Sequence, residues 1–344
     1  MQISVVTCDD TTAMAEVDTL LASNGLSRDA DVTLFAVARE DDRLIGCLGL
    51  AGDTVKCAAV APRAQGENVL APLLIEIRYQ ALDQGHPHLF CYTKPVYTQH
   101  FTALGFHAIA EVPGLAVLLE DDPRGIQRYE ESLKATARPG RRIAGIVMNA
   151  NPFTRGHEYL IRQAAEVCDV VHVFVVGEDA SVFTYAERFS MVSASVASMP
   201  EHDTIVVHPG SRYIISKTTF PQYFLKDEAD VERAYTGIDL ILFREHIAPA
   251  LGITDRFVGA EPTSAITRRY NEDMAYWLEQ APSAFPPVAV QVVPRLGCAD
   301  LPYISASIVR NLAAGVRFPE VKDLVPPPTF ELIQRKYATT QLHS

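Results

Sequence analysis

Ile143-Ala-Gly-Ile-Val-Met148, followed directly by Asn149-Ala-Asn-Pro-Phe-Thr-Arg-Gly-His157, is the stretch of this sequence that decides the fold. Its first six residues are almost wholly apolar, which is typical of a strand buried on both faces. The loop after them contains turn-forming Asn and Pro, and Thr154 is a favourable N-cap for a helix predicted over 156–167. A buried strand, a short loop and a helix form the first half of a βαβ unit.

The same alternation continues through the second half of the chain. Apolar, β-branched runs predict strands at 170–176, 204–208, 256–259 and 288–293, and helical spacing predicts helices at 186–199 and 307–314. This rhythm predicts a Rossmann-like α/β fold, with a parallel sheet covered by helices on both faces. Ligands of such sheets bind beyond the carboxyl ends of the strands, so the loop 149–157 is the first candidate site.

The residues upstream of this stretch have a different pattern. Two β-like runs around a polar turn predict a hairpin, further strands and helices follow, and Pro139-Gly140 separates a polar helical stretch from the strand at 143–148. The predicted strands are 33–39, 44–51, 55–60, 88–92 and 115–119, and the predicted helices are 68–82 and 96–104. We therefore predict a mixed α/β domain over residues 1–138 and the parallel-sheet domain over 139–344.

Composition excludes several classes of protein. Of 344 residues, 48% are hydrophobic and 21% charged, which is typical of a globular chain, and no apolar run approaches the roughly 18 residues of a membrane span. The acidic start lacks the pattern of a secretory signal, so we expect a cytoplasmic protein with no membrane partner. A net charge of −12 argues against a nucleic-acid partner. The six cysteines form no CxxC pair, and no metal-ligand set is predicted.

Two helix starts supply candidate phosphate-binding groups. A helix N-terminus presents unpaired N–H groups and a partial positive charge, Gly156 allows close backbone approach, and His157 can donate to a phosphate oxygen. Late in the chain, Ile304-Ser-Ala-Ser-Ile-Val-Arg310 opens another predicted helix. Its Ser305 and Ser307 can cap that helix or bind phosphate, and Arg310 can reach the same anion.

The pattern N-P-x-T-x-G-H after the first strand, with I-S-x-S-x-x-R late in the chain, resembles the HIGH-type nucleotidyltransferase superfamily. The resemblance implies that ATP or CTP binds at the first helix and that the acceptor attacks its α-phosphate with release of pyrophosphate. Thr154 and His157 would contact the triphosphate and stabilise the transition state, and Ser307 and Arg310 would bind the β and γ phosphates. Further candidates for the nucleotide site are Asn149, Asn151, Gly156, Gly259, Ser305 and Lys217.

Longer matches point to a particular family. Gly145-Ile-Val-Met-Asn-Ala-Asn-Pro-Phe-Thr-Arg-Gly-His157, Ser211-Arg-Tyr-Ile-Ile-Ser216 with Thr219-Phe-Pro-Gln-Tyr-Phe224, and Ile304–Arg310 resemble the citrate lyase ligases essentially end to end. This resemblance implies activation of acetate by ATP, with Mg²⁺ on the phosphates, and acetylation of the prosthetic-group thiol of the citrate lyase acyl-carrier subunit. A nucleotidyltransferase that makes a pantetheine- or nicotinamide-type cofactor, and a nucleotide-sensing binding module, remain as alternatives.

Two segments of the first domain resemble GNAT acetyltransferases. Val60-Ala-Pro-Arg-Ala-Gln-Gly-Glu-Asn68 is similar to their acyl-CoA pyrophosphate loop, and Phe101-Thr-Ala-Leu-Gly-Phe106 to a late segment of that family. The resemblance implies a GNAT-like fold in which Arg63, Gln65 and Gly66 bind the arm of the carrier. Phe101 stands where that family has a tyrosine that donates a proton, so the implied role is binding rather than acetyl transfer. A purely structural role is the alternative.

The sequence also supports predictions for two other positively charged residues. Lys217, near Arg212 and Tyr213, is predicted either to hold a carboxylate or phosphate or to be a solvated side chain. Arg188 follows Glu187 at the start of the predicted helix 186–199, and we predict that these two residues form a surface ion pair.

Overall fold

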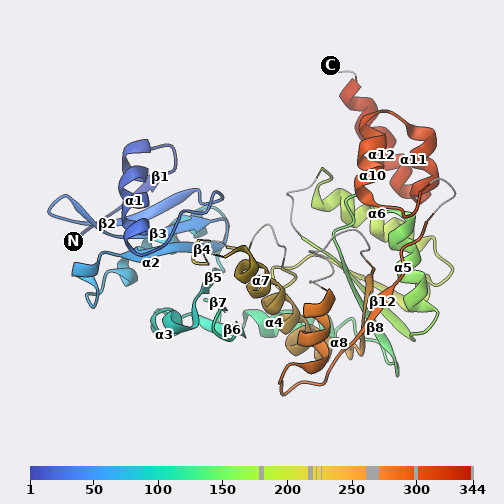
Figure 1. Cartoon of the computed structure of the whole chain (residues 1–344), viewed down its shortest axis with the longest axis horizontal. Coiled ribbons are helices and arrows are strands. Elements are labelled where there is room, and N and C mark those ends of the chain that lie inside the picture. The colour runs from blue at the N-terminus through green and yellow to red at the C-terminus, as the bar shows by residue number, and fades with distance from the viewer. Residues whose placement is uncertain are drawn as a thin grey trace. The chain divides into compact units, whose positions relative to one another are not determined.

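The computed structural model describes residues 1–177, 182–215, 220–221, 223–225, 227–260, 271–297 and 301–341. The chain divides into two compact units (Figure 1). The first contains Met1–Arg128 and Phe220–Ile238, and the second contains Tyr129–Thr219 and Asp239–Ser344. Among the described residues, no helix is both long enough and apolar enough to cross a membrane.

The first unit is built on a mixed seven-stranded sheet. Its strands are β1 (Gln2–Thr7), β2 (Leu34–Glu40), β3 (Arg43–Ala51), β4 (Thr54–Val60), β5 (Phe90–Thr93), β6 (His107–Val112) and β7 (Ala116–Glu120), in the order β1-β2-β3-β4-β5-β7-β6. Its helices include α1 (Thr11–Ser23), α2 (Leu70–Asp83) and α3 (Thr98–Ala103), with short 3-10 turns at Pro62–Ala64 and Pro95–Tyr97. The predicted hairpin is confirmed as β2 and β3, and the mixed α/β class is confirmed.

A distant part of the sequence contacts this sheet where the pairing of β4 and β5 ends. These two strands run parallel and pair only at their starts, where Thr54 lies opposite Phe90 and Val55 opposite Cys91. Beyond that point the buried Tyr223 donates its hydroxyl to the Tyr92 carbonyl of β5 at 2.9 Å. Tyr223, which lies far along the chain, thus contacts β5 at a position where β4 no longer pairs with that strand.

The second unit contains a five-stranded sheet that is parallel throughout. Its strands are β8 (Ile143–Met148), β9 (Val170–Val175), β10 (Ile205–His208), β11 (Asp255–Gly259) and β12 (Ala289–Val293), in the order β10-β9-β8-β11-β12. The chain builds outward from β8 through β9 to β10 and then returns to the other side of β8 with β11. The strand order therefore reverses between β8 and β11, and this reversal is where such sheets bind ligands.

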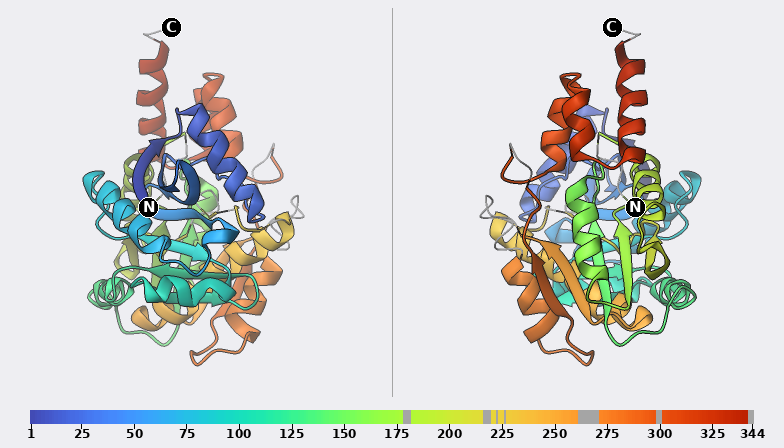
Figure 2. Two further views of the ribbon diagram at one scale, coloured as in Figure 1. Left: turned by 90° about the vertical axis from the view of Figure 1, so that its left-hand side faces the viewer. Right: turned by 90° about the vertical axis from the view of Figure 1, so that its right-hand side faces the viewer.

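Helices surround this sheet. They are α5 (Arg155–Ala165), α6 (Tyr185–Ala197), α8 (Ala248–Leu251), α10 (Ala306–Ala314), α11 (Phe318–Leu324) and α12 (Pro327–Gln341), while α4 (Gly125–Lys134) and α7 (Glu228–Leu242) span the boundaries of the two units. A 3-10 turn occupies His202–Thr204, and π-helical turns occupy Phe243–Ile247 and Tyr276–Gln280. The C-terminal helices α10, α11 and α12 pack on one another, as both views of Figure 2 show in red, and α12 lies along α6.

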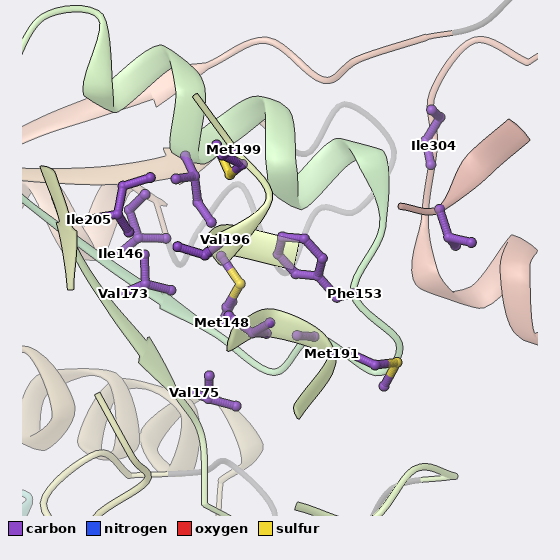
Figure 3. Packing of buried hydrophobic residues seen from close by; sticks show 14 of the residues in the cluster. Ile146, Met148, Phe153, Val173, Val175, Met191, Val196, Met199, Ile205 and Ile304 are labelled. Atoms are coloured by element: carbon purple, nitrogen blue, oxygen red, sulfur yellow. The ribbon is translucent and has the colours of Figure 1, made fainter. Parts of the chain in front are cut away.

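Alternation of side chains along the strands explains why the sheet is covered on both faces. In β8, Ile146 and Met148 point into a core with Phe153 and the α6 residue Val196 (Figure 3). Ile143 and the neighbouring β9 residue Phe174 belong to a second cluster on the opposite face, beside α8. Because successive residues of a strand point to opposite faces, a continuous apolar run fits only a strand buried on both sides.

Two histidines are buried in this sheet as an uncharged pair. His172 of β9 and His208 of β10 lie with Nδ1 and Nε2 2.8 Å apart, and both side chains are almost completely buried. Burial lowers the pKa of His172 to about 3 and that of His208 to about 4. Both imidazoles are therefore neutral in the folded protein at neutral pH.

This pair predicts a loss of stability in mild acid. Below pH about 6.5 the unfolded chain binds protons at both histidines while the folded chain does not, so the free energy of unfolding should decrease as the pH falls to about 4, and less steeply from there to about 3. Each histidine contributes about 1.4 kcal/mol per pH unit. Urea unfolding from pH 7.5 to 5 measures this slope. His208→Gln should reduce it, and replacement of the exposed His202 by Gln should not; equal slopes in all three proteins would contradict the prediction.

Candidate active site

The helix start after β8 fixes the orientation and the proton of His157. Thr154 is the N-cap of α5, and its Oγ1 accepts the backbone N–H of His157 at 3.4 Å. In return, Nδ1 of His157 accepts the backbone N–H of Thr154 at 3.0 Å. Since Nδ1 is an acceptor in this pair, the proton of the neutral ring resides on Nε2.

His157 is neutral under ordinary conditions. Burial of the ring, with a further contribution from the charge of Arg295, lowers the pKa of His157 to about 4. The ring also stacks on Phe153 with centroids 5.6 Å apart, which limits its rotation. His157 therefore presents one oriented N–H donor that carries no charge.

The late helix start lies against the first one. Ser305 is the N-cap of α10 and accepts the backbone N–H of Ile308 at 3.2 Å. Arg310, one turn into α10, donates Nη1 to the Asn151 carbonyl at 2.5 Å and Nη2 to Ser307 Oγ at 3.0 Å. The structure thus brings together two segments that are more than 150 residues apart in sequence.

Gly156 allows the two segments to meet. A Cβ atom at this position would lie 3.3 Å from the Ile304 carbonyl oxygen, a tight contact, and 3.4 Å from Thr154 Oγ1. A larger residue at this position would push α5 away from the chain that leads into α10. The structure therefore gives Gly156 a packing role in addition to the ligand approach predicted from the sequence.

A cavity of 630 Å³ opens where these elements meet, at the reversal of strand order between β8 and β11. Among the predicted nucleotide-site residues, those that line it are Asn149, Asn151, Thr154, Gly156, His157, Gly259, Ser305, Ser307 and Arg310. Lys217 lies outside the described residues. Among the described residues that line the cavity, the charged side chains are those of Arg295 and Arg310, and none is a carboxylate. The cavity is therefore suited to an anionic ligand.

Comparison with known proteins assigns the family. The model of the citrate lyase ligase C-terminal domain matches residues 143–333. The [citrate [pro-3S]-lyase] ligase of Escherichia coli K12 is 44% identical over 321 residues, which cover 93% of this chain and 90% of that protein. The ligase of Klebsiella pneumoniae is 43% identical over 319 residues, with 93% and 92% covered. The chain belongs to the citrate lyase ligase family.

Solved structures are more distant from this citrate lyase ligase family member. Escherichia coli ElaA is 10% identical, with a TM-score of 0.32, and the match covers 36% of this chain and all of ElaA. Thermotoga maritima TmcAL, solved with alpha-thio ATP, is 15% identical with a TM-score of 0.35, and the match covers 58% of this chain and 56% of TmcAL.

The prediction for Arg188 is wrong. Its side chain is completely buried rather than on the surface. It donates to the carbonyls of Asn149 and Val176, each at 2.8 Å, and of Phe183 at 3.3 Å. Glu187 instead pairs with Lys336 of α12 at 2.8 Å. Arg188 thus stabilises, through its hydrogen bond to the Asn149 carbonyl, the backbone of the loop that lines the cavity.

Sequence reasoning also missed Arg295. This residue lies two positions beyond β12, and its side chain lines the cavity. The signal was available, since polar residues just past the carboxyl ends of parallel strands are candidates for ligand binding. Arg295 belongs to none of the short motifs of this sequence.

Replacement of Arg310 should weaken ATP binding. The predicted role of Arg310 is to bind phosphate, and loss of such a charge-assisted contact in Arg310→Ala would cost about 1.5–3 kcal/mol, so the Kd for ATP should increase by roughly 10- to 150-fold. Arg310→Lys should recover only part of this, because an ammonium group cannot reproduce the planar guanidinium fork. Calorimetric titration with ATP measures both. A lysine variant with wild-type affinity would show that Arg310 serves only to join α10 to the Asn151 loop.

The candidate carrier-arm residues occupy one exposed loop of the first unit. Arg63 and Gln65 are exposed, and Gly66 has φ +91° with open space around it. The loop leads into α2, whose N-cap, Val69, makes no side-chain hydrogen bond to the first turn. By contrast, Phe101 is buried and packs edge-on against Phe106 with centroids 5.9 Å apart.

Proposed function

We propose that this chain is an ATP-dependent acid–thiol ligase for the citrate lyase acyl-carrier subunit. It would convert acetate and ATP into acetyl-AMP and pyrophosphate, and then pass the acetyl group to the prosthetic-group thiol with release of AMP. The observation that carries the proposal is the cavity between two helix starts, with Arg295 and Arg310 in its wall, in a member of the citrate lyase ligase family. Since the reaction consumes ATP, we place it in the cytoplasm.

In the first step, a carboxylate oxygen of acetate attacks the α-phosphorus and the bond to the pyrophosphate oxygen breaks. The first-turn N–H groups of α5 and the Nε2–H of His157 would bind phosphate oxygens, and Arg310 would bind the phosphates of the leaving group. Catalysis is then positioning and charge neutralisation, as in other phosphoryl and nucleotidyl transfers. No covalent intermediate with the protein is needed.

Magnesium would be carried by the triphosphate, where it neutralises phosphate charge. Among the residues that the structure describes, no cavity-lining side chain is a carboxylate, and no three His, Cys, Asp or Glu side chains gather as a metal site. In the second step, the carrier thiolate attacks the acetyl carbonyl carbon, and AMP leaves with the electron pair of the broken C–O bond.

Acetate-dependent exchange of labelled pyrophosphate into ATP tests the first step, and transfer of labelled acetyl to the citrate lyase acyl-carrier subunit tests the second. We expect both activities. Exchange that requires phosphopantetheine or a nicotinamide mononucleotide in place of acetate would instead indicate cofactor synthesis. ATP binding without any exchange would indicate a sensor.

The exposed loop of the first unit should affect only the second step. We propose that Arg63, Gln65 and Gly66 bind the phosphate-bearing arm of the carrier. Arg63→Glu should then reduce acetyl transfer about tenfold, by loss of one charge-assisted contact and introduction of repulsion, and leave acetate-dependent exchange unchanged. Arg43→Glu, at the exposed first residue of β3 in the same unit, is the matched control. Equal transfer rates in the two variants would remove this role from the loop.

A further inference from the structure

Contacts within the second unit hold Arg295 in a defined orientation, and two of them involve Ala260 and Tyr303. Its Nε donates to the carbonyl oxygen of Ala260, the residue that follows β11, at 2.8 Å. Its guanidinium carbon lies 5.2 Å from the centre of the Tyr303 ring, an ordinary cation–π separation. Tyr303 also lines the cavity. These contacts come from different segments and fix the guanidinium group at the cavity wall.

Backbone pairing explains why these segments lie together. The Ala260 N–H donates to the Val293 carbonyl at 2.8 Å and extends the pairing of β11 with β12. The Ile304 N–H donates to the Leu296 carbonyl at 2.8 Å, so the chain after β12 runs beside the chain that enters α10. Arg295 and Ser305 therefore reach the same cavity from neighbouring segments.

The site needs positive charge that His157 does not provide. His157 offers a fixed Nε2–H donor, but its ring is neutral. Arg310 is oriented by Asn151 and Ser307 toward the start of α10. Attack by acetate brings a second anion to the α-phosphate, so the repulsion between the two anions must be offset near His157.

We propose that Arg295 binds the phosphate group contacted by His157 and supplies the positive charge for attack by acetate. This inference rests on the proposed function. The two arginines then have different roles. Arg310 binds the leaving pyrophosphate, and Arg295 binds the phosphate group that acetate attacks. Because acetate brings its charge only as it approaches, Arg295 should contribute more to turnover than to ATP binding.

The test compares Arg295→Met, Arg295→Lys and a control, Arg317→Met, whose exposed guanidinium pairs with Glu320 on the surface of α11. The kcat of acetate-dependent exchange should fall about 10²-fold or more in Arg295→Met, while the Kd for ATP should change by less than about tenfold, or 1.4 kcal/mol. Arg295→Lys should retain part of the activity, and Arg317→Met all of it.

A second measurement needs no substrate. The pKa of His157, followed by NMR of the imidazole in protein without ATP, should rise in Arg295→Met and stay unchanged in Arg317→Met, because the charge of Arg295 contributes to the lowered pKa of His157 and that of Arg317 does not. If the wild-type protein showed no acetate-dependent exchange, the proposed function would be wrong, but the pKa of His157 could still be measured. An unchanged pKa of His157, or equal losses of ATP affinity and turnover, would overturn the role given to Arg295.

Discussion

Replacement of His157 by alanine is expected to reduce acetate-dependent exchange by about 10²- to 10³-fold, the usual effect of losing one donor to a developing charge. The reason is geometric. Nδ1 is occupied by the Thr154 N–H, so Nε2–H is the free donor, and stacking on Phe153 fixes its direction. Pyrophosphate exchange measures the loss, and circular dichroism checks the fold.

Two variants make this prediction specific. His107→Ala removes an exposed histidine of β6 and should leave exchange unchanged. His157→Asn keeps an acceptor for the Thr154 N–H but shortens the reach of the donor, so it should preserve stability better than alanine and still lose most of the activity. Near-normal exchange in a folded His157→Ala protein would contradict the catalytic role.

The sequence predicted the strands of the second unit better than those of the first, for a physical reason. β8 matches its predicted range residue for residue, and β9 differs only at its last residue, because parallel strands buried on both faces are continuous apolar runs. β1 was not predicted. It pairs only with β2 and has only half-buried and exposed residues, so its hydrophobic pattern is weak.

Membership of a compact unit was harder to predict than secondary structure. Residues 220–238 follow β10 in the sequence but belong to the first unit. One of the contacts that join this segment to the first unit is the hydrogen bond from the Tyr223 hydroxyl to the Tyr92 carbonyl, whose partners are about 130 residues apart. No local composition or periodicity encodes such a contact, whereas the proline and glycine near residue 139 are local signals.

The candidate site shows the same difference. Thr154 and Ser305 were predictable as N-caps because capping depends on the residue itself and its immediate neighbours. Arg188 was misread because a charged residue next to Glu187 suggested a surface pair. Its position in α6 carried the opposite signal, since residues 188, 192 and 195 share one helical face, and that face is buried.

Replacement of Arg188 by methionine is expected to lower the free energy of unfolding by about 3 kcal/mol or more. Methionine fills much of the same volume, but it leaves the carbonyls of Asn149, Val176 and Phe183 without their donor, and an unsatisfied buried polar group costs about 1–3 kcal/mol. Urea unfolding followed by circular dichroism measures the change.

The control for this prediction is Arg162→Met. Arg162 is exposed and pairs with Glu158 one turn away on α5, so its loss should change stability by less than about 1 kcal/mol. Arg188→Lys should recover only part of the lost stability, because one compact ammonium group cannot match the spread of the guanidinium donors.

Since the Asn149 carbonyl belongs to the loop that lines the cavity, Arg188→Met should also reduce acetate-dependent exchange in conditions where the protein remains folded. Equal stability of Arg188→Met and Arg162→Met would mean that these buried carbonyls find other donors, and the loop would then not depend on Arg188.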